Sequence, residues 1–285
     1  MLKIVVGIMI LLIVLLLIIK KTKMSSRLYI IGNGFDIYHG INSRYSNFKD
    51  YVEENDNDLY EMLEEYFDTV SLWSDFEETL AYIDVDTIVD DAENYLVSYG
   101  ADDWSDAYHH DYQYEIQRVV DIGTKQLKKH FTDWILQLDI PNNPQLTLEK
   151  RAKFLTFNYT DTLESVYNVP VNNIVYIHNK AVNQDSVLIL GHSRNPANTN
   201  SFREQNDEDT DPRVAEGNYI LDEYFSDTYK NTATLINDYQ DYFNGLSTIK
   251  EIYLLGHSIS PVDIEYFRIM KNMVDMKRYS MPKNM

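Results

Sequence analysis

Cysteine is absent from this chain of 285 residues, and basic residues are scarce in it. Without thiols the chain cannot form disulfide bonds or thiolate zinc sites, and its redox compartment cannot be inferred from cysteine usage. The 25 Lys and Arg stand against 45 Asp and Glu, which gives a formal net charge of −20. Because binding to a nucleic-acid backbone needs a basic surface, we expect no general nucleic-acid binding.

Repeats and metal-binding patterns are missing as well. The chain has no internal repeat and no long low-complexity tract. The adjacent His109 and His110 cannot both lie on one helix face, so they do not form a metal-binding pair. Since no compact cluster of carboxylates or histidines stands out, we expect no metal, and a nuclease mechanism is disfavoured.

The N-terminus carries the strongest targeting signal. Residues 4–19 are uncharged and almost wholly aliphatic, with one lysine before them and three lysines directly after them. At 1.5 Å per residue the run spans about 24 Å, and snorkelling lysines can bridge the rest of a hydrocarbon core of about 30 Å. We therefore expect residues 1–23 to be a single-pass membrane anchor. The lysine excess on its C-terminal side places the following domain, 24–285, in the cytoplasm.

Two alternatives to the anchor remain open. The run could be a cleaved signal peptide, although no small-x-small cleavage site follows it. Met24 could also be the true start, because the sequence leads from it straight into the first expected strand. The domain would then be soluble in the cytoplasm.

Short apolar runs bounded by turn residues predict buried strands. These runs are residues 28–31, 154–157, 174–177, 187–190 and 252–255. Apolar residues spaced three and four apart predict helices, and Ser74 with Glu77 forms a candidate capping box. The expected helices are residues 46–52, 59–67, 74–80, 87–99, 106–138, 221–243 and 262–273. Together these elements predict an α/β, Rossmann-like, mostly parallel sheet with helices on both faces and a helical insertion, about 46–138, after the first strand.

Polar residues follow every expected strand. The clusters are Gly32-Asn33-Gly34-Phe35-Asp36, Asn158-Tyr159-Thr160, His178-Asn179-Lys180, Gly191-His192-Ser193 and Gly256-His257-Ser258. Because the carboxyl ends of parallel strands open into one crevice, we expect these clusters to meet there. Structural readings stay open: Asn158 could cap a helix, His178 could be a hydrogen-bonded structural histidine, and the Gly-His-Ser runs could be ordinary turns.

Several of these motifs, taken together, resemble the AbiH family of phage abortive-infection proteins. The matching residues are Gly32 to Asp36 with Tyr45 and Phe48, Trp73 to Glu77, Phe157 to Thr160, and Gly256 to Ser258 with Asp263. The resemblance covers most of the chain after Met24. It implies a role in phage defence more firmly than it implies a reaction.

The same motifs are similar, more remotely, to the sirtuin pattern. The counterparts are Gly32-Asn33-Gly34, Thr156 to Thr160, His178-Asn179 and Gly256 to Ser258, in the sirtuin order. Asn33, Asn179 and Thr160 depart from the sirtuin residues, and the cysteines of the sirtuin zinc ribbon are absent. A protein deacetylase is therefore not expected. The analogy with cysteine-free sirtuin-like domains of phage defence implies cleavage of NAD.

These motifs lead to a hypothesis in which the crevice binds NAD as substrate or ligand. Backbone N–H groups of the Gly32–Asn33–Gly34–Phe35 turn would hold the pyrophosphate, and Asp36 would face the cationic transition state. Asn158 would orient the ribose or a water, and His178, with a pKa near neutral, would be the general base. Thr160 would belong to the binding wall, and Gly256, His257 and Ser258 would contact the adenosine side.

Two other classes of function remain as alternatives. The chain could be a non-catalytic, membrane-tethered nucleotide sensor or interaction protein. It could also be a hydrolase using Ser258 with a histidine and Asp263, although an adjacent His and Ser rarely form a productive triad. The nucleotide and the membrane are the expected partners, a homo-oligomer is possible in either case, and the phage-derived trigger is unknown.

Overall fold

The computed structural model describes residues 25–102, 104–273 and 279–280. The expected anchor, residues 1–23, and the alternative start at Met24 lie outside the described residues. In the part of the chain that is described, no helix is both long and apolar enough to cross a membrane.

A parallel sheet forms the centre of the molecule's α/β part. Its strands are β1 (Arg27–Ile31), β2 (Lys153–Thr156), β3 (Ile174–Tyr176), β4 (Glu251–Leu255) and β5 (Tyr279–Ser280). They pair in the order β3-β2-β1-β4-β5, always in parallel. Ile31 at the end of β1 lies opposite Thr156 on one side and Leu255 on the other, so three strand ends are level. The order reverses at β1, which is where doubly wound sheets bind ligands.

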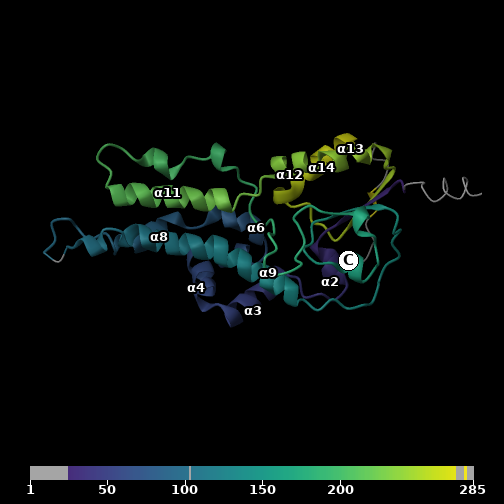
Figure 1. Ribbon diagram of the computed structural model, residues 1–285, viewed down its shortest axis with the longest axis horizontal. Helices are drawn as coiled ribbons and strands as arrows, with labels where there is room; N and C mark the ends of the chain where they lie inside the picture. Colours follow the sequence, from purple (N-terminus) through teal and green to yellow (C-terminus); the bar gives the residue numbers. More distant parts are fainter. Residues whose placement is uncertain (1–24, 103, 274–278, 281–285) are drawn as a thin grey trace, which may run out of the picture.

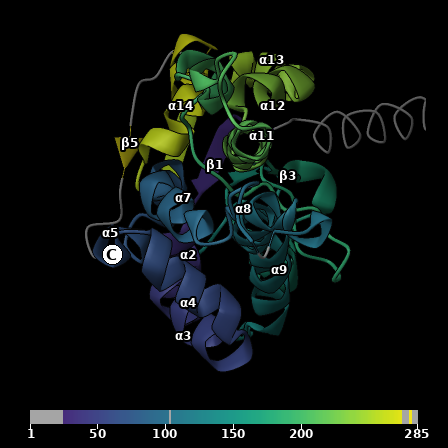
Figure 2. The ribbon, with the colours of Figure 1, turned by 90° about the vertical axis from the view of Figure 1, so that its left-hand side faces the viewer.

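Helices cover both faces of this sheet, as the sequence predicts. Leu28 and Ile30 of β1 face a core shared with Phe243 and Tyr266, whereas Tyr29 and Ile31 face the opposite core. The helices of the α/β part are α2 (Asn33–Tyr38), α10 (Thr162–Ser165), α12 (Thr232–Asp238), α13 (Gln240–Asn244) and α14 (Ile264–Met273). Helices α12 to α14 lie together on one side of the sheet (Figures 1 and 2). The alternation along β1 thus gives each face its own apolar core.

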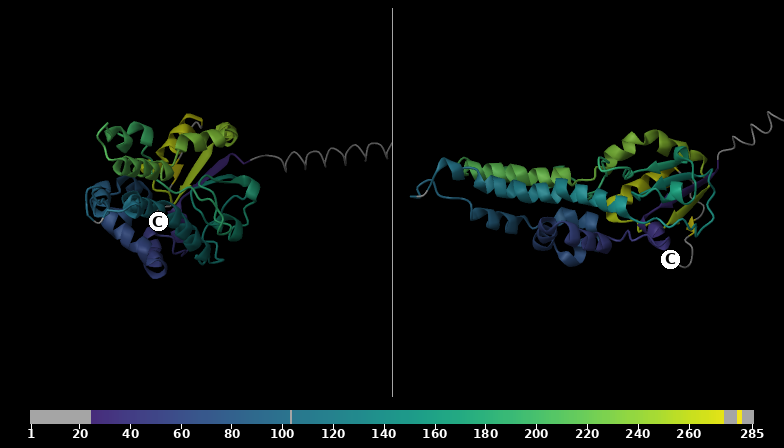
Figure 3. Two further views of the ribbon diagram at one scale, coloured as in Figure 1. Left: turned by 60° about the vertical axis from the view of Figure 1, so that its left-hand side comes forward. Right: turned by 60° about the horizontal axis from the view of Figure 1, so that its bottom comes forward.

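A helical insertion separates β1 from β2. It contains α3 (Tyr45–Asn55), α4 (Asn57–Tyr66), α5 (Thr69–Leu72), α6 (Phe76–Thr79), α7 (Val85–Glu93), α8 (Asp111–Asp121) and α9 (Leu127–Gln137). A π-helical turn, Ile122–Gln126, joins α8 to α9. Helix α11 (Pro212–Asp227) runs along α8, and the two extend away from the sheet as an arm (Figures 1 and 3). Gly217 permits this close packing, because a Cβ there would lie 2.7 Å from the ring of Tyr112.

Two long-range features differ from the sequence prediction. The apolar run 187–190 forms no strand: Leu188 and Leu190 pack into the helical core, and Val187 is exposed. The segment expected as one helix, 221–243, is divided among α11, α12 and α13. The chain leaves α11 at Thr228, where its backbone bonds to that of His192, and this break carries Lys230 into the molecule.

Helix ends also differ locally. Ser74 does not cap α6; Asp75 precedes the helix, and the Ser74 hydroxyl donates back to the carbonyls of Val70 and Ser71. Helix α7 begins at Val85, with the Asp84 carboxylate accepting the N–H of Thr87. Serine hydroxyls favour such local backbone bonds, which compete with capping.

Candidate functional site

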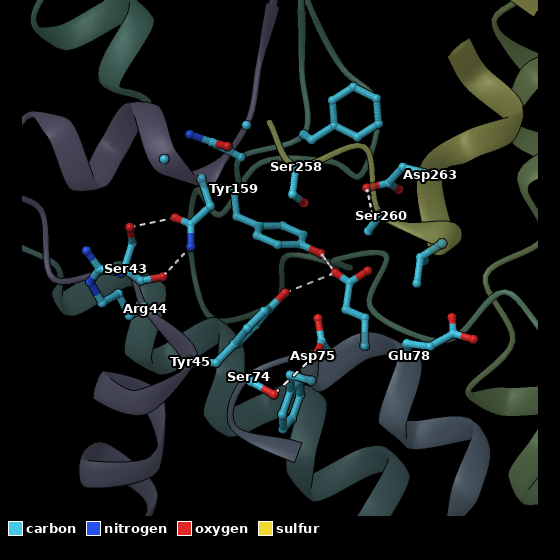
Figure 4. Close-up of a pocket in the computed structure, with 18 of the residues that line it drawn as sticks. Ser43, Arg44, Tyr45, Ser74, Asp75, Glu78, Tyr159, Ser258, Ser260 and Asp263 are labelled. Carbon is cyan, nitrogen blue, oxygen red and sulfur yellow. Dashed lines mark hydrogen bonds between the residues drawn. The ribbon is translucent and has the colours of Figure 1, made fainter. Parts of the chain in front are cut away.

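A cavity of about 1040 Å³ lies between the carboxyl ends of the strands and the inserted helices. Residues from β1, β2, β3 and β4 ends meet helices α3, α5, α6 and α9 in its wall. The predicted site residues that line it are Gly32, Asn33, Gly34, Asp36, Asn158, Thr160, His178, Gly256, His257 and Ser258. Four of the five predicted clusters therefore contribute residues to one cavity. Figure 4 is a close-up of this cavity.

Phe35 is the exception among the predicted site residues. Its side chain is fully buried, and its ring lies 4.4 Å from that of His39 and 5.7 Å from that of Tyr167. It packs under α2 in the sheet core, away from the cavity wall. The Phe35 side chain therefore takes no part in the cavity wall, because the first turn of α2 rotates it into the core.

The Gly-Asn-Gly turn and the turn after β4 are packed backbone to backbone. A Cβ on Gly32 would lie 2.6 Å from His257 Cα, and one on Gly256 would lie 2.0 Å from the Phe35 nitrogen. Gly256 also has a φ of +67°, a conformation that favours glycine. These glycines are needed for the close approach of the two strand ends, whatever binds in the cavity.

This packing uses the N–H groups that a phosphate would need. Gly32 N–H donates to Leu255 O at 3.0 Å, Gly34 N–H to Gly256 O at 2.8 Å, and Phe35 N–H to Gly32 O at 2.9 Å. A pyrophosphate could bind these groups only by displacing internal hydrogen bonds. Three of the backbone N–H groups at this turn are therefore already bonded within the chain. The Asn33 side chain is engaged too, through hydrogen bonds with the Ser43 carbonyl and hydroxyl.

Asp36 lies under the cavity wall and holds the loop after β2. Its carboxylate accepts the hydroxyls of Thr160 at 2.6 Å and Thr162 at 2.9 Å. Burial raises the pKa of Asp36, while the hydrogen bonds from the hydroxyls of Thr160 and Thr162 oppose that rise. With both oxygens occupied, Asp36 acts mainly as an anchor for the segment that positions Asn158.

Asn158 is a buried amide without internal hydrogen-bond partners. Its side chain is 6% exposed, and neither its nitrogen nor its oxygen makes a hydrogen bond to any described residue. Its backbone N–H, in contrast, donates a hydrogen bond to the Thr156 hydroxyl at 3.1 Å. An unpaired buried amide is costly, by about 1–3 kcal/mol per group. Its position in the wall of the cavity means that a ligand there can supply the missing partners.

Two histidines flank the carboxylate of Asp263. His178 Nε2 lies 3.5 Å from Asp263 Oδ1, and His257 Nε2 lies 3.5 Å from Oδ2. Burial, together with the charge of Lys230, lowers the pKa of His178 to about 3. The near-neutral pKa expected for this histidine is therefore wrong, and its ring is uncharged at pH 7. No group of three or more described His, Asp or Glu side chains is arranged to hold a metal ion.

Lys230 is the charged centre of the site. Its side chain is fully buried, it pairs with Glu77, and its Nζ lies 3.6 Å from Asp263 Oδ1. Burial alone would lower the pKa of Lys230, but the two carboxylates reverse this and raise it. Two phenols complete the shell: Tyr159 and Tyr45 lie 3.0 Å and 3.4 Å from Glu77 Oε1, with their hydroxyls directed to it (Figure 4).

Sequence reasoning missed Lys230 and the role of Glu77. Glu77 stood out only as a capping partner and within the family-like run 73–77, and nothing near Lys230 suggested a buried ammonium. The second Gly-His-Ser run, in contrast, does not line the cavity; Ser193 bonds to Glu78, and burial lowers the pKa of His192 to about 4. Lys230 and Glu77 are 153 residues apart in the chain, so no local sequence pattern indicates that they are in contact.

Comparison with known proteins adds the family. Neither the curated proteins nor the solved structures include a match to the chain. The family model described as bacteriophage abortive infection AbiH matches residues 28–281, from β1 to the end of the described sheet. That match covers most of the chain and all the residues of the cavity, and so the chain belongs to the AbiH family of phage abortive-infection proteins.

Proposed function

We propose that this abortive-infection protein binds NAD in the cavity and hydrolyses the bond between nicotinamide and ribose. The observation that carries the proposal is Asn158: a buried amide, unpartnered within the described chain, in the same wall as His178 and two buried carboxylates. A cavity of about 1040 Å³ at the switch point of a parallel sheet is large enough for a nucleotide.

The reaction requires water to add to C1′ of the ribose while the C1′–N bond breaks. Nicotinamide leaves as a neutral base with the electron pair of that bond, and the water gives up one proton. Asn158 would orient the ribose hydroxyls or the water, and the uncharged His178 would accept a hydrogen bond or the proton. The positive charge that develops on the ribose is stabilised by a nearby carboxylate.

Asp263 suits that last role better than Asp36. Both oxygens of Asp36 already accept threonine hydroxyls, whereas Asp263 Oδ1 makes no hydrogen bond within the described residues. The charge of Lys230 and the hydrogen bonding of the neighbouring His257 ring outweigh the effect of burial and lower the pKa of Asp263, so this carboxylate is ionised at neutral pH. The pyrophosphate would extend toward Arg44, an exposed residue of the cavity wall.

The test is NAD turnover by the full chain, purified in mild detergent, with and without extract of phage-infected cells. We expect nicotinamide release from the wild type and a loss of at least 100-fold in kcat/KM for Asn158→Ala, about 3 kcal/mol of transition-state stabilisation. Asn198→Ala, in a polar turn far from the cavity lining, is the control and should keep its activity. Binding of NAD without turnover under both conditions would instead support a nucleotide sensor.

We also propose that residues 4–19 tether this domain to a membrane. Their uncharged aliphatic character supports the proposal, and the first strand begins at Arg27, only a few residues beyond the flanking lysines. Fractionation of cells that express the chain from Met1 or from Met24 tests it. We expect the first in the membrane fraction and the second outside it; equal distribution of the two would contradict the tether.

A further inference from the structure

The floor of the cavity carries more negative than positive charge. Lys230 is one ammonium between two carboxylates, Glu77 and Asp263. The Nδ1 of His257 accepts the Ile259 N–H at 2.8 Å, so that nitrogen faces the backbone and not the cavity. His178 is uncharged, since its pKa is lowered. Lys230 is shared between Glu77 and Asp263, so these three charged groups together carry one net negative charge.

The remaining wall does not compensate this charge. Asp68, Asp75 and Glu78 also line the cavity, and Arg44 is the one Lys or Arg in its lining among the described residues. Arg44 is exposed to solvent, so its charge is screened. A concave, poorly hydrated surface lined by one sign of charge concentrates ions of the opposite sign. The cavity is therefore predisposed to hold a cation.

Aromatic rings border the two histidines beside Asp263. The Phe157 ring lies 4.2 Å from that of His257 and 5.3 Å from that of His178. The Tyr159 ring lies 6.2 Å from that of His178 between ring centroids. Aromatic faces attract cations, and flat rings pack well against them. A planar cationic ring suits this border better than a compact ammonium or a metal ion.

Polar atoms without partners face the same space. Asp263 Oδ1, His178 Nε2 and both side-chain polar atoms of Asn158 have no hydrogen-bond partner among the described residues, and all three residues are buried. The set offers two acceptors that lack a donor, together with an amide that can both donate and accept. A ligand with its own carboxamide can pair with the amide of Asn158 while its positive charge lies near Asp263.

We propose that the floor of the cavity is a cation-selective subsite for a pyridinium carboxamide, the positively charged base of an N-ribosyl substrate. This inference rests on the proposed function and narrows it. The protein takes substrates whose leaving base is cationic and discriminates against neutral nucleosides. Breaking the glycosidic bond removes the positive charge from the base, so the subsite holds the neutral product less tightly than the substrate.

The test compares two small probes of nearly identical shape. 1-Methylnicotinamide is a cation, and 3-methylbenzamide is its neutral carbon isostere. Isothermal titration calorimetry on the full chain in detergent should show the cation binding at least tenfold more tightly, which corresponds to about 1.4 kcal/mol. Equal affinities for the two probes would overturn the proposal.

Variants locate the effect. Asp263→Asn should bring the affinity ratio of the two probes close to one, while Asp209→Asn, which does not line the cavity, should leave it unchanged. If Asp263→Asn fails to fold by circular dichroism, Asp75→Asn, an exposed residue of the lining, should still lower the ratio two- to threefold. An unchanged ratio in the folded variant that is used would refute the assignment.

The outcome is separable from that of the proposed function. Selective binding of the cation without NAD turnover would keep the subsite and remove the catalytic proposal. NAD turnover without preference for the cation would keep the catalytic proposal and remove the subsite.

Discussion

Replacing Lys230 with methionine probes the charged centre of the site most sharply. At the 3.6 Å between Lys230 Nζ and Asp263 Oδ1, the attraction is about 4–5 kcal/mol for an effective dielectric constant near 20, and Glu77 lies closer still. Burying the ammonium offsets most of this energy in the intact protein. Removing it leaves two buried carboxylates unpaired, so we expect Lys230→Met to lower the free energy of unfolding by about 3–5 kcal/mol at pH 7.5.

The pH dependence gives this prediction a second readout. Without Lys230, the folded-state pKa values of Glu77 and Asp263 rise, and a carboxyl with a raised folded pKa contributes stability that is present at low pH and lost as pH rises through that value. The deficit of Lys230→Met should therefore be smaller at pH 5 than at pH 7.5. Adding Glu77→Gln should recover at least about 1 kcal/mol, because one of the unpaired charges is gone.

Urea unfolding of the full chain in detergent, followed by tryptophan fluorescence, measures these differences. Lys125→Met is the matched control: its ion pair with Asp121 is on the surface, with the lysine side chain 73% exposed, and should be worth less than about 0.5 kcal/mol. A loss under about 1 kcal/mol for Lys230→Met, or a loss equal at both pH values, would show that the buried network is not as described.

Three further predictions concern the same wall. The pKa of His178 is lowered to about 3 in the folded protein, so protonation of this histidine favours the unfolded chain. The free energy of unfolding should therefore be highest above pH 6.5 and should fall by about 2 kcal/mol between pH 7 and pH 5. Urea unfolding should show that His178→Gln removes this loss. Gly256→Ala should cost about 2–4 kcal/mol in the same assay, since its Cβ would clash with the Phe35 nitrogen, whereas Gly40→Ala, with a positive φ but open space, should cost about 1 kcal/mol. Thr160→Val should lower the free energy of unfolding by about 1–3 kcal/mol, because it removes a hydrogen bond to the buried Asp36 carboxylate. An unchanged free energy of unfolding would show that this hydrogen bond does not stabilise the fold.

The sequence predicted those features that depend on residues close together in the chain. Apolar runs ending in glycine marked β1 and β4, because a buried parallel strand is apolar on both faces and the close approach of two turns admits no Cβ at Gly32 or Gly256. Parallel strands then required the clusters after them to share one edge, which placed Asn158 and His178 in one cavity. That step needed only the topology.

Features that depend on distant packing could not be predicted. The run 187–190 is as apolar as a strand, but its leucines fill the helical core. Lys230 looks like an ordinary surface lysine until the break after α11 carries it to Glu77, 153 residues away along the chain. The internal bonds of the Gly-Asn-Gly turn could not be predicted for a similar reason: the N–H groups of Gly32 and Gly34 bond to the carbonyls of Leu255 and Gly256, partners that the local sequence does not reveal.

The most direct test of the central claim is the fate of NAD in water enriched in ¹⁸O. After incubation of NAD with the full chain and extract of infected cells, mass spectrometry should find nicotinamide and ADP-ribose in equal amounts, with one ¹⁸O at C1′ of the ADP-ribose. Asn158→Ala should lose both products together. Intact NAD in the wild-type reaction, or equal product from the wild type and Asn158→Ala, would contradict the account.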